Sequence, residues 1–278
     1  MKIRILLLTM LPVICLAQVN PNGEKPAGEL LSKEISPNEM KRNASFNVEE
    51  IKVRWKKAAL ENCTGVPCVA APSFTCGTST ISDIDGNIYE TVSIGTQCWT
   101  KTNLKVSKYN NGSSIPTGLN NTAWQSTTSG AYAIYDNALA NESIYGKLYN
   151  WYAVVDSRGL CPTGWHVPID AEWTTLTDNL GGLSVAGGKM KSTGTTYWFF
   201  QSAGTDNSSG FTALPGSKRE HFGLFNTVIG VYAFFWSATE NGLSPGTAWD
   251  RNLYLISDDV NRFIQEKSMG ASVRCLKD

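Results

Sequence analysis

Six cysteines follow a short apolar segment at the amino terminus of this 278-residue chain. Lys2 and Arg4 are positively charged, residues 5–16 are mostly apolar, and small side chains lead up to Ala17. This order is typical of a secretory signal peptide (residues 1–17), and we predict cleavage after Ala17. The apolar run is shorter than the roughly 20 residues that span a bilayer. We therefore expect a secreted or cell-surface protein with no membrane span after cleavage.

An even number of cysteines remains after cleavage, which favours disulfides in a secreted chain. Cys15 leaves with the signal peptide; lipid attachment there would need a small residue before it, and Ile14 is not small. A metal site is the alternative, but no CxxC motif occurs and only two histidines could contribute. We predict disulfides and no metal. The pairing is open at this point among Cys63, Cys68, Cys76, Cys98, Cys161 and Cys275.

The charge balance argues against nucleic acid as a partner. Lys and Arg total 24, Asp and Glu also total 24, and the net charge is zero with neutral histidine. A nucleic-acid binder normally shows a basic excess or a basic stripe. Charged residues make up only 17% of the chain, beside nine Trp, ten Tyr and many small polar residues. This composition indicates a loop-rich extracytoplasmic domain rather than a cytosolic enzyme.

The composition also divides the mature chain into a leader and a main domain. Residues 18–75 are predicted to be a flexible leader, because Pro, Asn, Glu, Lys and Ser dominate its first part. Within it, residues 48–60 have apolar side chains at helical spacing, which predicts a short amphipathic helix. That helix either binds a partner, packs on the following domain or forms part of a linker. A cysteine-rich connector follows it, and the main domain is expected over residues 76–278.

The segment 160–180 combines a cysteine, a Pro-Thr-Gly turn, an extended piece and a helix. Val167 is expected to be extended because it precedes a proline. Asp170 and Glu172 place negative charge at the amino terminus of the helix, where the helix dipole favours it. The apolar face of this helix is predicted from the spacing of Trp173, Leu176 and Leu180.

An Asp-Gly pair predicts the first β-hairpin of the domain, with strands at residues 81–85 and 87–94. Asp83 and Asp85 also resemble the start of a calcium loop. However, Ile94 stands where such a loop needs its bidentate glutamate. We therefore favour a tight turn without calcium.

Few helices and many short strands are predicted for the remaining chain. The aromatic segment 145–155 is either a short helix or a buried strand, and residues 200–222 form a long polar loop. Runs of β-branched and aromatic residues, separated by Asn, Gly, Pro and Asp, predict strands at residues 228–236, 248–256 and 271–276. The expected fold class is α+β with long loops.

Several distinctive blocks follow one another in the main domain. They are DGNIY from Asp85, IGTQCW from Ile94, NL at Asn103, CPTGWHVP from Cys161, EW at Glu172, WSATE from Trp236 and SVRC from Ser272. In this order they resemble the Fibrobacter succinogenes major paralogous domain family. That family is similar in turn to sulfatase-modifying factors, whose fold is related to C-type lectins. The resemblance implies a surface domain of Bacteroidetes-type bacteria with a C-type-lectin-like core and no well-defined activity.

The resemblance also implies a cysteine pairing and the start of the helix. Lectin-like domains tie a cysteine near a helix to the last strand, and a second bridge would cross the first hairpin. Family members usually carry Thr or Ser before the Asp-Ala-Glu of the helix, where it forms a capping box. Ile169 stands there, so Asp170 is the expected cap. The implied pairs are Cys161–Cys275, Cys76–Cys98 and Cys63–Cys68.

No catalytic constellation is recognisable in the sequence. His166 is predicted to be a hydrogen-bonded packing residue, and His221 lies in a charged loop and is expected to be solvated. No GxSxG, HExxH or phosphate-binding loop is present. The related formylglycine-generating enzymes use a reactive cysteine pair near the carboxyl terminus, where this chain has only Cys275. We therefore expect no enzyme activity and no cofactor.

A binding function is the remaining expectation, with a glycan or a surface protein as partner. The Glu-Pro-Asn and Trp-Asn-Asp motifs of calcium-dependent lectins are absent. A calcium-free site could use exposed Trp beside carboxylates or amides, although the same Trp residues could instead belong to the core, as we expect for Trp236. An adhesive or purely structural surface protein is the alternative. The candidate ligand-binding residues are Trp198, Asp206, Asn207, Glu240, Asn241, Trp249 and Asp250.

Overall fold

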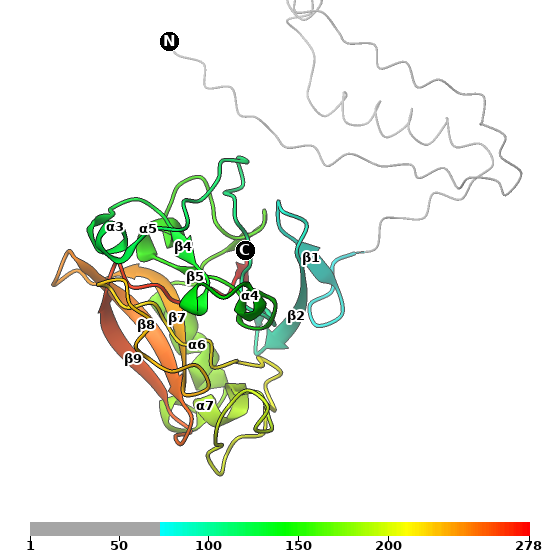
Figure 1. Ribbon diagram of the computed structural model, residues 1–278. Helices are drawn as coiled ribbons and strands as arrows, with labels where there is room; N and C mark the ends of the chain where they lie inside the picture. The colour runs from blue at the N-terminus through cyan, green and yellow to red at the C-terminus, as the bar shows by residue number, and fades with distance from the viewer. Residues whose placement is uncertain (1–72) are drawn as a thin grey trace, which may run out of the picture. The chain divides into compact units, whose positions relative to one another are not determined.

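The computed structural model describes residues 73–278 of the chain (Figure 1). The predicted signal peptide, the helix at 48–60 and the pair Cys63–Cys68 lie outside the described residues. The described part is an α+β domain with few helices, several antiparallel sheets and two disulfides. Within residues 73–278, no helix has the length and apolar character needed to cross a membrane.

The largest sheet has five strands in the order β1-β2-β3-β10-β6, and every neighbouring pair is antiparallel. The last strand of the domain, β10, therefore lies between β3 and β6 rather than at an edge. The strands are β1 (Thr80–Ser82), β2 (Ile88–Ile94), β3 (Gln97–Thr100), β6 (Trp165–His166) and β10 (Leu276–Lys277).

A second sheet has three antiparallel strands in the order β7-β8-β9. These strands are β7 (Tyr232–Glu240), β8 (Thr247–Tyr254) and β9 (Val260–Glu266). Two helices, α6 (Asp170–Asn179) and α7 (Leu183–Met190), pack against one face of this sheet, as Figure 1 shows. We call it the helix face.

Shorter elements connect the two sheets. The pair β4–β5 forms a separate two-stranded sheet. The elements are α3 (Asn121–Ser126), β4 (Tyr132–Ala133), the 3-10 helix η1 (Tyr135–Asn137), α4 (Leu139–Tyr145), β5 (Leu148–Tyr149) and α5 (Trp151–Val154).

The core consists of aromatic clusters on the two faces of β7-β8-β9. Successive side chains of a strand point to opposite faces, so Phe235 joins the cluster under the helices and Trp236 joins the other cluster. Under the helices, the rings of Trp99 and Trp173 lie 4.8 Å apart, and those of Trp173 and Phe235 lie 5.7 Å apart. Such ring pairs contribute beyond their buried area. Trp236 is fully buried, as predicted.

The first hairpin has the predicted tight turn. The Asp83 carboxylate accepts the backbone N–H groups of Asp85 and Asn87, each at 3.0 Å, and the Tyr89 hydroxyl at 2.6 Å. Gly86 supplies the positive φ of 83° that the turn requires. The carboxylate of Asp85 accepts hydrogen bonds from Ser107. Both carboxylates are thus used to hold the hairpin.

Some strand predictions were wrong in position or extent. β7 begins four residues later than the predicted strand 228–236 and extends to Glu240. Only β10 and isolated bridges form within 271–276. The segment 145–155 contains both a strand and a helix, β5 and α5. β9 was missed, because its charged and amide side chains mask the apolar alternation of a half-exposed strand.

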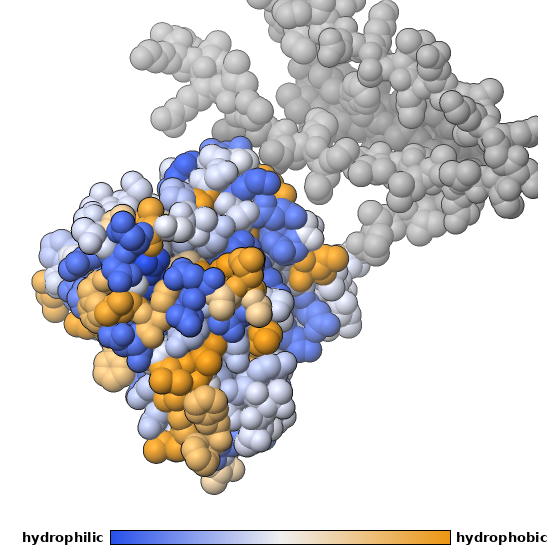
Figure 2. Space-filling model, in the orientation of Figure 1, coloured by the Kyte–Doolittle hydropathy of each residue, from blue (hydrophilic) through white to orange (hydrophobic). Residues whose placement is uncertain are grey.

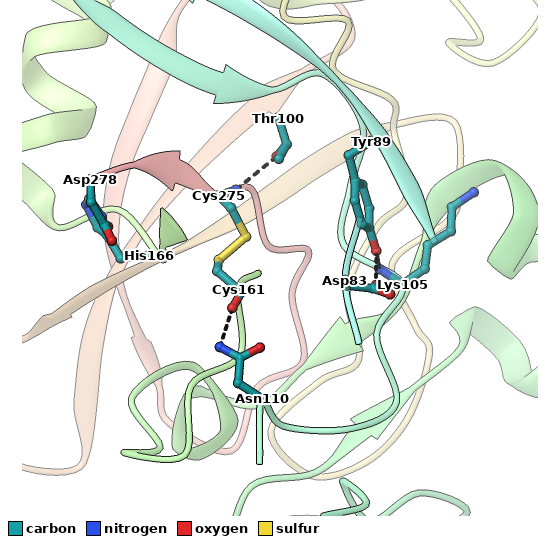
Figure 3. Close-up of a disulfide and its surroundings, with 9 residues drawn as sticks. All are labelled: Asp83, Tyr89, Thr100, Lys105, Asn110, Cys161, His166, Cys275 and Asp278. Atoms are coloured by element: carbon teal, nitrogen blue, oxygen red, sulfur yellow. Dashed lines mark hydrogen bonds and ion pairs between the residues drawn. A yellow bond between two sulfur atoms is a disulfide. The ribbon is translucent and has the colours of Figure 1, made fainter. Parts of the chain in front are cut away.

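Two disulfides join distant parts of the domain, Cys76–Cys98 and Cys161–Cys275. They are the two pairs within the described residues that the resemblance implied. Around the second bridge, Thr100 Oγ1 accepts the N–H of Cys275 at 2.9 Å and Asn110 donates to the carbonyl of Cys161 at 2.7 Å (Figure 3). This bridge fastens the segment before β6 to the segment before β10.

Helix α6 begins with half of a capping box. Ile169 is the N-cap and has no side-chain acceptor, but Glu172 accepts its backbone N–H at 2.8 Å. Asp170 is the first helical residue, so the expectation that it caps the helix was wrong. Its carboxylate instead binds two arginines, and its own N–H donates to Thr239 Oγ1 at 2.9 Å.

Several buried cations hold loops without a carboxylate partner, among them Arg274 and Lys191. The guanidinium of Arg274 is 1% exposed, and burial lowers its pKa to about 9. The ammonium of Lys191 donates to Ser202 Oγ at 2.6 Å and to the carbonyl of Ser257 at 2.7 Å. Burial lowers the pKa of Lys191 to about 8. Lys191 thereby ties the long loop after α7 to the β8–β9 turn.

Candidate functional site

Three of the predicted ligand-binding residues lie in the loop between α7 and β7. Trp198 is fully buried and donates its indole N–H to the carbonyl of Ala213 at 3.1 Å, so it is a core residue. Asp206 is exposed and accepts the N–H of Ser208 at 2.8 Å. Asn207 bonds to Thr212 through both its amide nitrogen and its oxygen. These residues shape the loop and do not converge on a site.

The other four predicted residues lie on the β7–β8 hairpin, but they point in different directions. Glu240 is exposed and paired with Lys267, whose ammonium lies 4.6 Å from the centre of the Trp151 ring. Asn241 is 3% exposed and holds the hairpin loop. Trp249 and Asp250 are consecutive in β8 and therefore face opposite sides of the sheet.

Asp250 is a buried acid on the face opposite the helices. Neither of its carboxyl oxygens has a hydrogen-bonding partner among the described residues. Burial raises the pKa of this carboxyl to about 7, because an apolar environment disfavours the charged form. Asp250 does not reach the surface and cannot contact a ligand together with Trp249.

Trp249 is half-buried on the helix face, where a guanidinium covers one side of its ring. The guanidinium carbon of Arg262 lies 3.3 Å from the centre of the Trp249 ring. Asp170 holds Arg262 in this position. The Nε of Arg262 lies 3.0 and 3.1 Å from the two carboxylate oxygens of Asp170. A ligand would therefore meet the edge of the indole and the guanidinium rather than a bare ring.

The carboxylate of Asp170 fixes this arrangement by bridging two arginines. Arg251, which is 1% exposed, donates to Oδ1 at 2.6 Å, and Arg262 pairs with Oδ2 at 3.0 Å. Burial raises the pKa of Asp170, but the two arginines outweigh this effect and keep it below its ordinary value. The cluster therefore carries two guanidinium charges against one carboxylate.

We call this cluster the Trp249 site and define it by Trp249, Arg262, Asp170, Arg251 and Ile264. Ile264 is 49% exposed and lies directly opposite Trp249 in the β8–β9 ladder. Of these residues, only Trp249 was predicted from the sequence as a ligand contact. Arg262 and Ile264 lie on β9, which was not predicted, and the only signal for them was the alternation within VNRFIQE.

His166 is held between the carboxylates of Asp278 and Glu172; Figure 3 shows His166 beside Asp278. Its Nδ1 lies 2.7 Å from Asp278 Oδ1, and its Nε2 lies 3.0 Å from Glu172 Oε1. Each ionised carboxylate needs a donated N–H, and only the doubly protonated imidazolium can donate from both nitrogens. His166 is thus a cation that bridges two carboxylates, and it is more exposed than the predicted packing residue would be. Both of its ring nitrogens have partners, so it lacks the free nitrogen that a general base needs.

This bridge predicts a pH-dependent contribution to stability. Partial burial lowers the pKa of His166, but the bonds to Asp278 and Glu172 outweigh it and raise the pKa above its ordinary value. The stabilisation is complete below the unfolded pKa of about 6.5 and is lost as the pH rises through the folded pKa. His166 is partly exposed, so we expect less than about 1 kcal/mol. Urea unfolding of wild type and His166→Gln, below and above this window, measures it.

The comparison with His166→Gln separates this effect from the titration of Asp250. The raised pKa of Asp250 also makes stability fall with pH, up to about 7. That contribution is common to both proteins and cancels in their difference. An equal stability difference between the two proteins at all pH values would contradict the prediction.

An open polar pocket of about 220 Å³ lies beside β1 and β2. Most of its hydroxyl groups are already used within the protein. Thr91 Oγ1 donates to the carbonyl of Ser79 at 2.8 Å and accepts the N–H of Gly77 at 3.0 Å. Its rim carries the ion pair of Glu90 and Lys101 at 3.0 Å. We therefore place the candidate site at Trp249 and not in this pocket.

An exposed apolar band lies on a different part of the surface. Backbone hydrogen bonds connect Phe199 to Gly230 and Leu255 to Val231, which brings the loop after α7 close to the β8–β9 turn. Figure 2 shows apolar residues in orange along the lower half of the view, where these loops lie in Figure 1. The exposed apolar side chains of these loops include Phe199, Phe200, Val228 and Ile256.

These features define a disulfide-linked α+β domain with a half-exposed Trp-Arg-Asp cluster on its smaller sheet. Within residues 73–278, no group of three or more His, Cys, Asp or Glu side chains is arranged to hold a metal ion. The chain belongs to the Fibrobacter succinogenes major domain family, whose model matches residues 92–277. No curated protein and no solved structure matched the chain.

Proposed function

We propose that this protein is a non-catalytic binding protein of the cell surface or the secreted fraction, and that its Trp249 site takes carbohydrate. The observation that carries the proposal is the half-exposed indole of Trp249, fixed against Arg262. The indole N–H makes no hydrogen bond to any described residue, and the side chain of Arg262 is 38% exposed. Both groups can therefore donate to a ligand.

Carbohydrate fits this combination of groups. A sugar ring has an apolar C–H face and several hydroxyl oxygens that accept hydrogen bonds. The edge of Trp249 and the exposed Ile264 supply apolar contact, while the indole and the guanidinium supply donors. Because Asp170 fixes Arg262 in advance, little side-chain entropy is lost on binding. A C-type-lectin-like core, extracytoplasmic location and a role in adhesion are parts of this proposal, and the signal-peptide pattern and two disulfides support it.

Chemistry at cysteine has no support in the described residues. The related formylglycine-generating enzymes need reactive thiols, whereas Cys275 is joined to Cys161. His166 is occupied on both ring nitrogens. These two observations favour binding over catalysis.

A glycan array of the full-length secreted chain tests the proposal, with and without EDTA. We expect saturable binding that EDTA does not change. Trp249→Ala should weaken it by about tenfold or more, as expected for a central aromatic contact. Phe200→Ala is the matched control, because Phe200 is 66% exposed and lies on a distant loop.

Two results would replace this function by another one. Binding to cells or immobilised protein without any glycan binding would favour protein adhesion, for which the exposed apolar band is the better surface. Binding that is lost in EDTA would indicate a calcium site instead. Unchanged glycan affinity in Trp249→Ala would move the site elsewhere, provided that thermal unfolding shows the variant to be folded.

A further inference from the structure

The outer edge of β9 is a free sheet edge. β9 is the terminal strand of β7-β8-β9, and Figure 1 shows no described helix or strand beyond it. It is seven residues long, whereas the edge strands of the five-stranded sheet, β1 and β6, have three and two residues. A long free edge presents unpaired backbone groups to other chains.

The backbone groups that point outward can be assigned from the pairing with β8. Lys267 donates its N–H to Gly246 at 2.9 Å, so alternate residues before Lys267 also face β8. The outward-facing residues are then Arg262, Ile264 and Glu266. No described group bonds to their N–H groups or to the carbonyls of Arg262 and Ile264; only the carbonyl of Glu266 is used, by Met269.

Few of the usual protections of an edge strand are present here. β9 contains no proline and no lysine, and its two charged side chains are Arg262 and Glu266; proteins normally use proline, lysine and other charged side chains, or bulges, to block edge pairing. Its one cationic side chain, Arg262, is folded back onto Trp249 and Asp170. Phe263 and Ile264 are 52% and 49% exposed, on opposite faces of the sheet.

We infer that this edge pairs with β9 of a second copy of the chain in an antiparallel, two-fold arrangement centred on Ile264. In this register Ile264 lies opposite Ile264 of the second copy, and Arg262 lies opposite its Glu266. Opposite charges and apolar pairs directly across a ladder are stabilising. The strand is thus complementary to itself, as a two-fold interface requires.

The neighbouring register, in which Phe263 lies opposite Phe263 of the second copy, is disfavoured by the burial of Val260. It also leaves Arg262 and Glu266 opposite apolar residues instead of opposite each other. It would place Val260 opposite Glu266 of the second copy, but Val260 is 2% exposed. Helix α7 packs against that end of β9, and Gly187 lies close to the carbonyl of Asp259. The register centred on Ile264 uses only residues 262–266. This register joins the two three-stranded sheets into one six-stranded sheet, with both Trp249 sites on the same face. The dimer would then bind ligand at two sites; this last point rests on the proposed function, whereas the pairing does not.

Oligomeric state in solution tests the pairing. Light scattering of the full-length secreted chain over a concentration series should show a monomer–dimer equilibrium. Ile264→Lys places two like charges face to face and should raise the dissociation constant by about tenfold or more. Ile88→Lys is the matched control, because Ile88 is 71% exposed on β2, and it should leave the dimer unchanged. A wild-type monomer at all concentrations would overturn the pairing, as would a dimer that Ile264→Lys does not weaken.

Cysteine cross-linking tests the register independently of the effect of a charge. Paired residues with exchanged hydrogen bonds have Cα atoms about 5.5 Å apart, within the range of a disulfide. Ile264→Cys should therefore give an oxidised dimer whose introduced thiols are linked to each other in non-reducing peptide maps. Phe263→Cys should give little oxidised dimer, because residue 263 of the second copy lies diagonally across the ladder and not directly opposite. Cross-linking of Phe263→Cys but not Ile264→Cys would overturn the register.

Discussion

Replacing Arg274 by methionine should destabilise the domain by about 3–4 kcal/mol, the largest effect we expect from a single side chain. The guanidinium is buried and donates to the side-chain oxygen of Asn103 at 2.7 Å. It also donates to the carbonyls of Thr100 at 2.9 Å, Phe211 at 2.8 Å and Thr212 at 3.1 Å. Methionine fills similar space but leaves these four acceptors without a donor.

Urea unfolding of Arg274→Met measures this effect, with two further variants as controls. Arg274→Lys keeps the charge but has a single nitrogen, which cannot reach all four acceptors, so an intermediate loss is expected. Arg158→Met removes an arginine whose side chain is 40% exposed and paired with Asp156, so its loss of stability should be much smaller than that of Arg274→Met. Equal losses for Arg274→Met and Arg158→Met would contradict the assignment of Arg274 as a buried cation whose hydrogen bonds hold these segments together.

Removing the Cys161–Cys275 bridge by paired alanine substitution should cost about 4–5 kcal/mol. The sequence separation of 114 residues makes the closed loop long, and a longer loop restricts the unfolded chain more strongly. Total stabilities of domains are about 5–15 kcal/mol. The double variant should therefore be only marginally folded at room temperature.

The other bridge provides the matched control. Cys76 and Cys98 are separated by 22 residues, so the same chain-entropy argument gives about 3 kcal/mol for their paired alanine variant. Thermal and urea unfolding of the two double variants should rank them in this order. The reverse order would show that native packing, and not loop length, decides how much each bridge contributes.

Local signals in the sequence predicted a good part of the fold. The Asp-Gly pair located the first hairpin, and the acidic first turn of segment 160–180 located α6. Both depend on interactions within a few residues, such as Asp83 with Asp85 or Glu172 with Ile169. The pairs Cys161–Cys275 and Cys76–Cys98 were accessible only through the family resemblance, because even six cysteines allow many pairings.

The candidate site was much less predictable, because it depends on contacts between distant segments. Arg262 reaches Asp170 across 92 residues of sequence, and the alternation of β9 was hidden by its polar side chains. Trp198 and Trp249 were both predicted as ligand-binding residues, yet Trp198 belongs to the core and Trp249 is half-buried at the surface. The buried cation Lys191 has no local signal, because its partners are Ser202 Oγ and the backbone carbonyls of a distant turn.

The place of β10 in the large sheet has a consequence for biosynthesis. Residues 272–277 are translated after every other element of the domain, yet they supply the strand between β3 and β6, the buried guanidinium and one half of the long bridge. Contacts this distant in sequence form late and slowly. A chain that is still bound to the ribosome therefore lacks a completed core. Products that terminate before residue 272 should remain open to proteases.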